Sequence, residues 1–216
     1  MTSLLSYVIQ FAIVFPAIIL HEISHGYVAY LLGDDTAKRA GRLSINPIRH
    51  VDPVGTVILP AAMLILSQGR YFFGWAKPVP INPYRFRNQR EGMLLTGVAG
   101  PVTNIALSAL AGLVIRVAGG SAVLGIGLFG ISLGYVVEFF CYANLVLAFF
   151  NLIPIPPLDG SRVVQYFLPD RMRDAYHSLE RYGFILLIGV TWVLPGAFGA
   201  YLQATVEPLF SLFTGL

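Results

Sequence analysis

Long apolar runs dominate this sequence and restrict what it can fold into. Residues 4–32, 93–117 and 123–153 are almost uniformly apolar, and each reaches the roughly 20 residues that a helix needs to cross a bilayer. Charged residues make up 12% of the chain, against about 25% in a soluble domain. We therefore expect an all-α polytopic membrane protein, a bundle of about four to six transmembrane or re-entrant helices.

Other segments do not fit a simple span. Residues 54–68 are apolar but short, which suits a re-entrant segment as well as a span, and residues 183–213 are interrupted by Pro195-Gly196. The alternating stretch Arg42–Ile45 favours strand or turn, and three prolines within 74–83 exclude a helix. We expect a small extended or β element there, on the cytoplasmic side.

Lysine and arginine are unevenly distributed along the chain. Of 14 such residues, nine lie between 33 and 92 and four between 157 and 181. Because these residues stay on the cytoplasmic side of short loops, we expect both regions to face the cytoplasm. Residues 1–216 then form one membrane domain, with a core at about 4–165 and a C-terminal apolar segment at 183–213, because too few polar residues remain for a separate soluble domain.

Composition also narrows the partners. The net charge is +3, but no stretch combines clustered basic residues with aromatic ones as a nucleic-acid-binding face does. Anionic lipid headgroups explain the charge more simply, so we expect membrane lipids and no nucleic acid as partners. Cys141 is the only cysteine, which excludes an internal disulfide.

The sharpest chemical feature is the HExxH pattern His21-Glu22-Ile23-Ser24-His25 within the first apolar run. Residues four apart share one face of a helix, so two imidazoles can bind one zinc ion while Glu22 accepts a proton from zinc-bound water. Ionisable residues at lipid depth are costly and usually functional. The alternative is a set of polar residues satisfied by neighbours within the bundle.

A catalytic zinc ion usually has three protein ligands and one water. Two acidic candidates for the third ligand are Glu138, inside an apolar run, and Asp159, at the end of that run. Asp159 follows a helix break made by prolines, and broken backbone at membrane depth requires a hydrated or protein-lined cavity. The positive-loop orientation brings Asp159 to the depth of His21 and His25. Its alternative role is a helix N-cap.

The two motifs together resemble the site-2 protease family of intramembrane zinc metalloproteases. HExxH is combined with Asn151-Leu152-Ile153-Pro154-Ile155-Pro156-Pro157-Leu158-Asp159-Gly160, and residues 15–165 carry further similarities, such as Gly100-Pro101-Val102-Thr103-Asn104. The resemblance is to the compact group without PDZ or CBS domains.

This resemblance implies His21, His25 and Asp159 as ligands of one zinc ion, Glu22 as catalytic base and Asn151 as an oxyanion donor. It also implies that residues 74–83 clamp an unwound substrate as an added strand. The expected activity is endoproteolysis in or near transmembrane segments of other proteins, in a prokaryotic cell membrane, with the active site toward the cytoplasm. Substrate identity and oligomeric state stay open.

Three other functions use the same residues. A metal transporter or sensor needs polar residues along a route to the opposite face, and the outer halves of the long spans offer almost none. A prenyl-protein protease leaves the motif around Asp159 unexplained. A catalytically inactive member is disfavoured because every chemical group is present.

Among weaker signals, we expect His50 to be a turn residue and His177 an interfacial one. Asn104 and Asn144 favour interhelical hydrogen bonds, Gly97 to Gly100 favour close helix packing, and Glu138 is either a gating or a packing residue.

Overall fold

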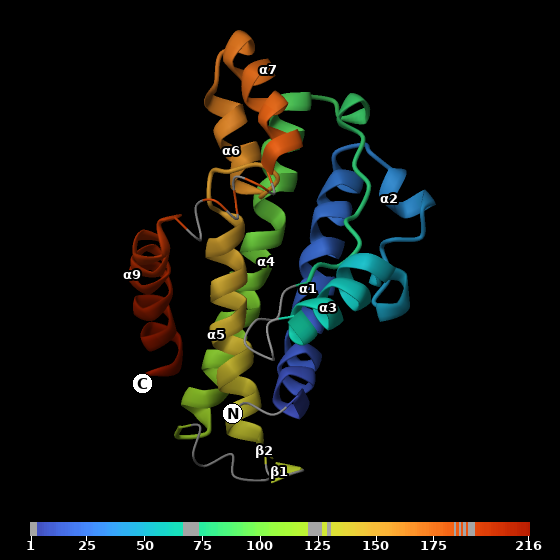
Figure 1. The fold of residues 1–216 in the computed structure, drawn as a ribbon. Coiled ribbons are helices and arrows are strands. Elements are labelled where there is room, and N and C mark those ends of the chain that lie inside the picture. Colours follow the sequence, from blue (N-terminus) through green and yellow to red (C-terminus); the bar gives the residue numbers. More distant parts are fainter. Residues whose placement is uncertain are drawn as a thin grey trace.

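The computed structural model describes residues 4–66, 74–120, 127–128, 131–183, 185, 187, 189 and 193–216. Helices dominate these residues (Figure 1). The α-helices are α1 (Leu4–Leu31), α2 (Thr36–Arg39), α3 (Leu59–Leu66), α4 (Gln89–Val117), α5 (Leu133–Asn151), α6 (Gly160–Phe167), α7 (Asp170–Ser178) and α9 (Pro195–Thr214). Shorter helical turns are η1 (Pro47–His50), η2 (Pro53–Ile58), η3 (Pro83–Arg85) and η5 (Leu179–Tyr182), and the strands are β1 (Gly127–Leu128) and β2 (Ile131–Ser132).

Three long helices, α1, α4 and α5, form the centre of the protein. By length and composition each can cross a membrane, and α4 runs opposite to its neighbours α1 and α5 (Figure 1). Helix α9 packs on the outer side of α4 and α5, and α6 packs against α4. The expected all-α membrane architecture is confirmed.

Small residues let α4 approach its neighbours closely. A Cβ at Gly112 would lie 2.6 Å from the Cβ of Phe213 in α9, and a Cβ at Gly97 would lie 2.9 Å from the Cβ of Arg162 in α6. Small residues that let a neighbouring helix approach in this way are a usual means of tight helix packing in membranes. The expectation of close packing along Gly97–Gly100 therefore describes this face of α4 well.

One long span was predicted wrongly at its start. Helix α5 begins at Leu133 rather than near residue 123. Before it, residues 127–128 and 131–132 form β1 and β2, and residues 121–126 and 129–130 lie outside the described residues. Ser132 then caps α5 by accepting a hydrogen bond from the Tyr135 N–H. Apolar composition gave no sign of this boundary.

The shorter segments fall as follows. Residues 53–66 form η2 and α3, which together are too short to count as a span. Helix α9 begins at Pro195, where a missing N–H costs nothing. Arg42–Ile45 is not a strand, and residues 74–82 are extended without strand pairing in the described chain. The strand pair β1–β2 lies at the end of the bundle away from α2, α6 and α7 (Figure 1). The small β element expected beside the basic loops is therefore not present among the described residues.

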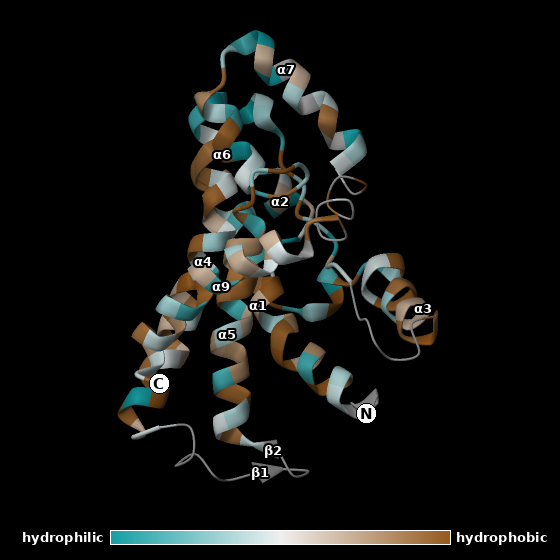
Figure 2. Cartoon of the chain, turned by 60° about the vertical axis from the view of Figure 1, so that its left-hand side comes forward, coloured by the Kyte–Doolittle hydropathy of each residue, from teal (hydrophilic) through white to brown (hydrophobic). Residues whose placement is uncertain are grey.

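The two ends of the bundle differ in polarity. Helices α2, α6 and α7 gather at one end, away from β1 and β2 (Figure 1). Hydrophilic residues are frequent in α7 (Figure 2). The two basic regions of the sequence therefore meet at one end of the helices.

Candidate metal centre

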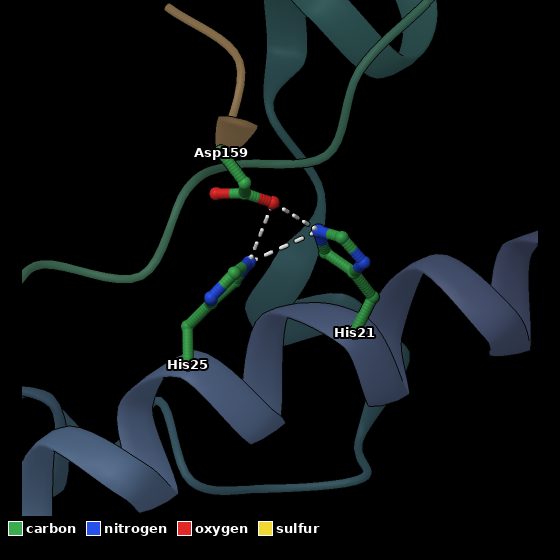
Figure 3. Close-up of side chains that lie close together, drawn as sticks. All are labelled: His21, His25 and Asp159. Atoms are coloured by element: carbon green, nitrogen blue, oxygen red, sulfur yellow. Dashed lines mark hydrogen bonds and ion pairs between the residues drawn. The ribbon is translucent and has the colours of Figure 1, made fainter. Parts of the chain in front are cut away.

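His21 and His25 lie one turn apart in α1 and point toward the same place (Figure 3). Their exposed fractions are 6% and 4%. Their Nε2 atoms are 3.0 Å apart, and the rings meet edge to face with centroids 4.6 Å apart. The helical spacing thus brings two nitrogen donors together inside the bundle.

Asp159 meets both imidazoles from the turn that leads into α6 (Figure 3). Its Oδ2 atom lies 3.2 Å from Nε2 of His21 and 3.2 Å from Nε2 of His25. Although Asp159 precedes the first residue of α6, its side chain makes no capping hydrogen bond. Asp159 thus occupies the N-cap position of α6, but its side chain faces the imidazoles and does not cap the helix.

The three donor atoms fit a tetrahedral metal ion. Zinc bonds of 2.0–2.1 Å to nitrogen or oxygen place neighbouring ligands of a tetrahedron about 3.3 Å apart. The observed edges of 3.0, 3.2 and 3.2 Å are close to this value, and all three residues are buried. Two imidazoles and one carboxylate leave a fourth position, as in catalytic zinc sites.

The Asp159 carboxylate is held in its ionised form. Burial alone raises the pKa of this group, but hydrogen bonds with His21 and then His25 outweigh the burial and hold the pKa well below its usual value. A carboxylate that stays ionised when buried is suited to binding a cation.

Helix α4 supports both imidazoles. The Nδ1–H of His25 donates to the backbone oxygen of Thr96, with 2.5 Å between the atoms, which leaves Nε2 free to bind a metal. A Cβ at Gly100 would lie 2.4 Å from Cε1 of His21 and 2.5 Å from Nε2 of His25. Only glycine therefore lets α4 come this close to the rings.

The Glu22 side chain contacts the extended segment 74–82. Its Oε2 atom accepts a hydrogen bond from the Val79 N–H at 2.9 Å. The same segment is held at Lys77, whose N–H donates to the backbone oxygen of His50 at 2.9 Å, and whose backbone oxygen accepts from Arg42. The carboxylate next to the two histidines is thereby attached to a segment more than 50 residues away in sequence.

Asp34, which the sequence did not single out, holds the far end of this segment. It is fully buried, and its Oδ2 accepts a hydrogen bond from the Asn82 N–H at 2.6 Å. Two carboxylates associated with α1, from Glu22 and Asp34, therefore bind backbone N–H groups of one extended segment. Aspartate after a helix is common, so the sequence offered no signal that could have identified this role.

The remaining residues of interest lie outside the three-ligand group. Asn151, near the end of α5, donates through Nδ2 to the backbone oxygen of Leu147 at 2.9 Å; its role as oxyanion donor stays a prediction. His50 is buried, and its Nε2 pairs with the backbone oxygen of Ser44 in the turn. Glu138 is half-buried in α5. The side chain of His177 lies outside the described residues.

Asn104 and Asn144 do not show the expected interhelical hydrogen bonds among the described residues. Asn144 donates to the backbone oxygen of Phe140 in its own helix. Both side-chain polar atoms of Asn104 are buried without a partner in this part of the chain. Neither residue belongs to the three-ligand group.

Comparisons with known proteins agree with this geometry. Residues 114–194, which include the motif around Asp159, match peptidase family M50. A Bacillus subtilis protein named "Putative zinc metalloprotease YwhC" is 37% identical over 219 residues, which cover 99% of this chain and 94% of that protein. A Mycolicibacterium smegmatis protein named "Putative zinc metalloprotease Rip2" is 26% identical over 198 residues, 85% of this chain and 68% of its own length.

Another relative is much longer than this chain. The protein named "Zinc metalloprotease MJ0392" of Methanocaldococcus jannaschii is 28% identical over 168 residues, 78% of this chain but 37% of its own length. No solved structure matches the chain. Similarity to YwhC over nearly the whole chain, together with the family match, implies zinc as the metal and settles the family. The chain belongs to peptidase family M50, the site-2 protease family, and is a membrane metalloendopeptidase.

Proposed function

We propose that this protein hydrolyses peptide bonds in or near transmembrane segments of other membrane proteins. The observation that carries the proposal is the position of the three donors: His21 and His25 project from a helix able to span a membrane, and Asp159 reaches them from the loop after another such helix. This position supports a substrate chain that is embedded in the membrane or lies next to it. Residues 1–216 are proposed to act as one protease domain.

The residues divide the chemistry among them. His21, His25 and Asp159 would hold one zinc ion. When bound there, zinc supplies a Lewis acid that polarises a peptide carbonyl and makes water a nucleophile near neutral pH. Glu22 takes the proton of the attacking water and delivers it to the departing amine. Asn151 would donate to the developing oxyanion through the second N–H of its Nδ2, because the first N–H donates to the Leu147 carbonyl.

The extended segment 74–82 offers a place for unwound substrate. Trp75, Lys77 and Val79 direct their N–H groups inward, to Gly55, His50 and Glu22. In an extended chain alternate residues point their N–H and C=O groups to opposite edges, so Ala76, Pro78 and Pro80 face the other edge. The two prolines there are exposed and cannot donate. We propose that this edge accepts N–H bonds from a substrate strand, a form of strand addition.

The basic loops support an orientation. Arginine and lysine gather at the end of the bundle that holds α2, α6 and α7, and such residues mark the cytoplasmic side. We propose that the protein lies in a prokaryotic cell membrane with its site toward the cytoplasm.

Glu22→Gln tests the proposed activity most sharply. The full chain is reconstituted in vesicles with a membrane-embedded test substrate that contains a helix-breaking residue. We expect Glu22→Gln to retain zinc and to lose cleavage by at least about 100-fold, since general base catalysis contributes on the order of 10²–10⁴. His25→Ala is expected to lose zinc as well. Undiminished cleavage by Glu22→Gln would refute the proposal.

A further inference from the structure

The two oxygens of Asp159 have different partners. Oδ2 faces both imidazoles, whereas Oδ1 lies 3.6 Å from Nη1 of Arg162, three residues later in the first turn of α6. That Nη1 atom is buried and makes no hydrogen bond within the described part of the chain. One carboxylate therefore connects the two histidines with an arginine that no comparison or motif assigns to the site.

Packing against α4 fixes the stem of Arg162. A Cβ at Gly97 would lie 2.9 Å from the Cβ and 3.2 Å from the Cδ of Arg162, and 3.2 Å from the backbone oxygen of Asp159. The first turn of α6 thus presses Arg162 against α4 at a position that only glycine permits. The guanidinium is placed by the same contact that places the backbone of Asp159.

We propose that Arg162 is a positioning residue for Asp159, which holds Oδ1 so that Oδ2 alone is presented to the metal. The inference rests on the proposed metal role of His21, His25 and Asp159. The terminal torsion of a carboxylate is broad, so a partner on the far oxygen restricts how the near oxygen meets the ion. Partners of metal ligands typically change metal affinity or activity by about 10–100-fold when removed.

Charge alone predicts the opposite result. Removing a cation near a bound metal ion reduces repulsion and would tighten zinc binding. The guanidinium, however, faces the oxygen turned away from the imidazoles. Although its Nη1 atom is buried, 27% of the Arg162 side chain is exposed, so solvent weakens part of the repulsion. Orientation therefore outweighs repulsion, and loss of Arg162 weakens binding.

A second arginine provides a matched control. Arg173 in α7 also pairs with an aspartate three residues before it, with 2.9 Å between Nη2 of Arg173 and Oδ1 of Asp170. Its side chain is 28% exposed, close to the value for Arg162, but Asp170 is 87% exposed and belongs to no metal-ligating group. Arg162→Gln and Arg173→Gln remove the same charge from equally exposed positions.

The test measures zinc affinity of the full chain in detergent by competition with a chelator. We expect Arg162→Gln to bind zinc at least about 10-fold more weakly than the native chain, and Arg162→Lys, which keeps the charge but not the planar fork, to fall between the two. Arg173→Gln is expected to stay within about twofold, as for a surface ion pair. The visible spectrum of the cobalt-loaded chain should change in Arg162→Gln and not in Arg173→Gln.

Several results would overturn the inference. Unchanged or tighter zinc binding by Arg162→Gln would show that orientation does not dominate, and an equal loss in Arg173→Gln would show a general charge effect. If Arg162→Gln fails to fold, Arg162→Lys decides: native affinity would contradict a role for the fork. Failure of the proposed metal site looks different, because the native chain would then bind zinc no better than His25→Ala. Failure of the proposed hydrolysis alone would appear as undiminished cleavage by Glu22→Gln and would leave these zinc affinities unchanged.

Discussion

Gly100→Ala is a minimal perturbation with a large expected effect on the metal centre. The added Cβ would lie 2.4 Å from Cε1 of His21, 2.5 Å from Nε2 of His25 and 2.6 Å from Nδ1 of His21. Ordinary contact begins near 3.4 Å, so the rings and α4 must separate by about 1 Å, and a displacement of that size can cost roughly 100-fold in rate. We expect zinc binding to weaken at least about 10-fold and cleavage to fall by about 100-fold.

Gly100→Ala is expected to weaken zinc binding and cleavage, which is the opposite of what its effect on helix propensity alone would favour. Alanine favours a helix over glycine by about 1 kcal/mol, so a loss of zinc binding cannot come from a weaker helix propensity of α4 and must come from the contact with the imidazoles. Gly199→Ala in α9 is the control, because a Cβ there meets nothing within 4 Å. Zinc affinity is measured by chelator competition, and cleavage with the vesicle assay. Native zinc affinity and cleavage in Gly100→Ala would refute the claim that the imidazoles are held against α4.

Two further predictions concern the extended segment. Val79→Pro removes the N–H that binds Oε2 of Glu22, whereas Val79→Ala keeps it, so we expect kcat to fall several-fold more in the proline variant while zinc content stays native; equal kcat values would contradict this role. Asp34→Asn should lower the free energy of unfolding by about 1–3 kcal/mol, because the two buried oxygens accept from the Thr36 and Asn82 N–H groups and asparagine offers only one acceptor oxygen for both. Thermal unfolding in detergent checks this against Asp35→Asn, at a partly exposed ion pair worth about 0–1 kcal/mol; equal losses would argue against the tether.

Helix-scale features of this protein follow from its sequence because they depend on local chemistry. The apolar run at 4–32 became α1 at Leu4–Leu31, and the four-residue spacing of His21 and His25 placed both on one face. The prolines before Asp159 correctly indicated a break in the helix. The start of α5 was mispredicted because an apolar run does not by itself separate helix from strand, and residues 127–128 and 131–132 within this run form β1 and β2.

Features that depend on tertiary contact could not be predicted in this way. Thr96 supports His25 through its backbone oxygen, an atom that every residue has. Gly100 was interpreted as a helix-packing glycine, and only the fold shows that its neighbours are the two imidazoles. In sequence, Asp34 is an ordinary residue after a helix and Arg162 an ordinary residue near the start of one. Their contacts with Asn82 and Gly97 appear only when segments distant in sequence meet in the fold.

Diffraction from the zinc-loaded full chain, with anomalous data at the zinc edge, tests the central claim most directly. The claim predicts one zinc peak within about 2.0–2.2 Å of Nε2 of His21, Nε2 of His25 and one oxygen of Asp159. A peak bound by the two histidines with Asp159 beyond about 3 Å, or a peak elsewhere in the chain, would contradict it.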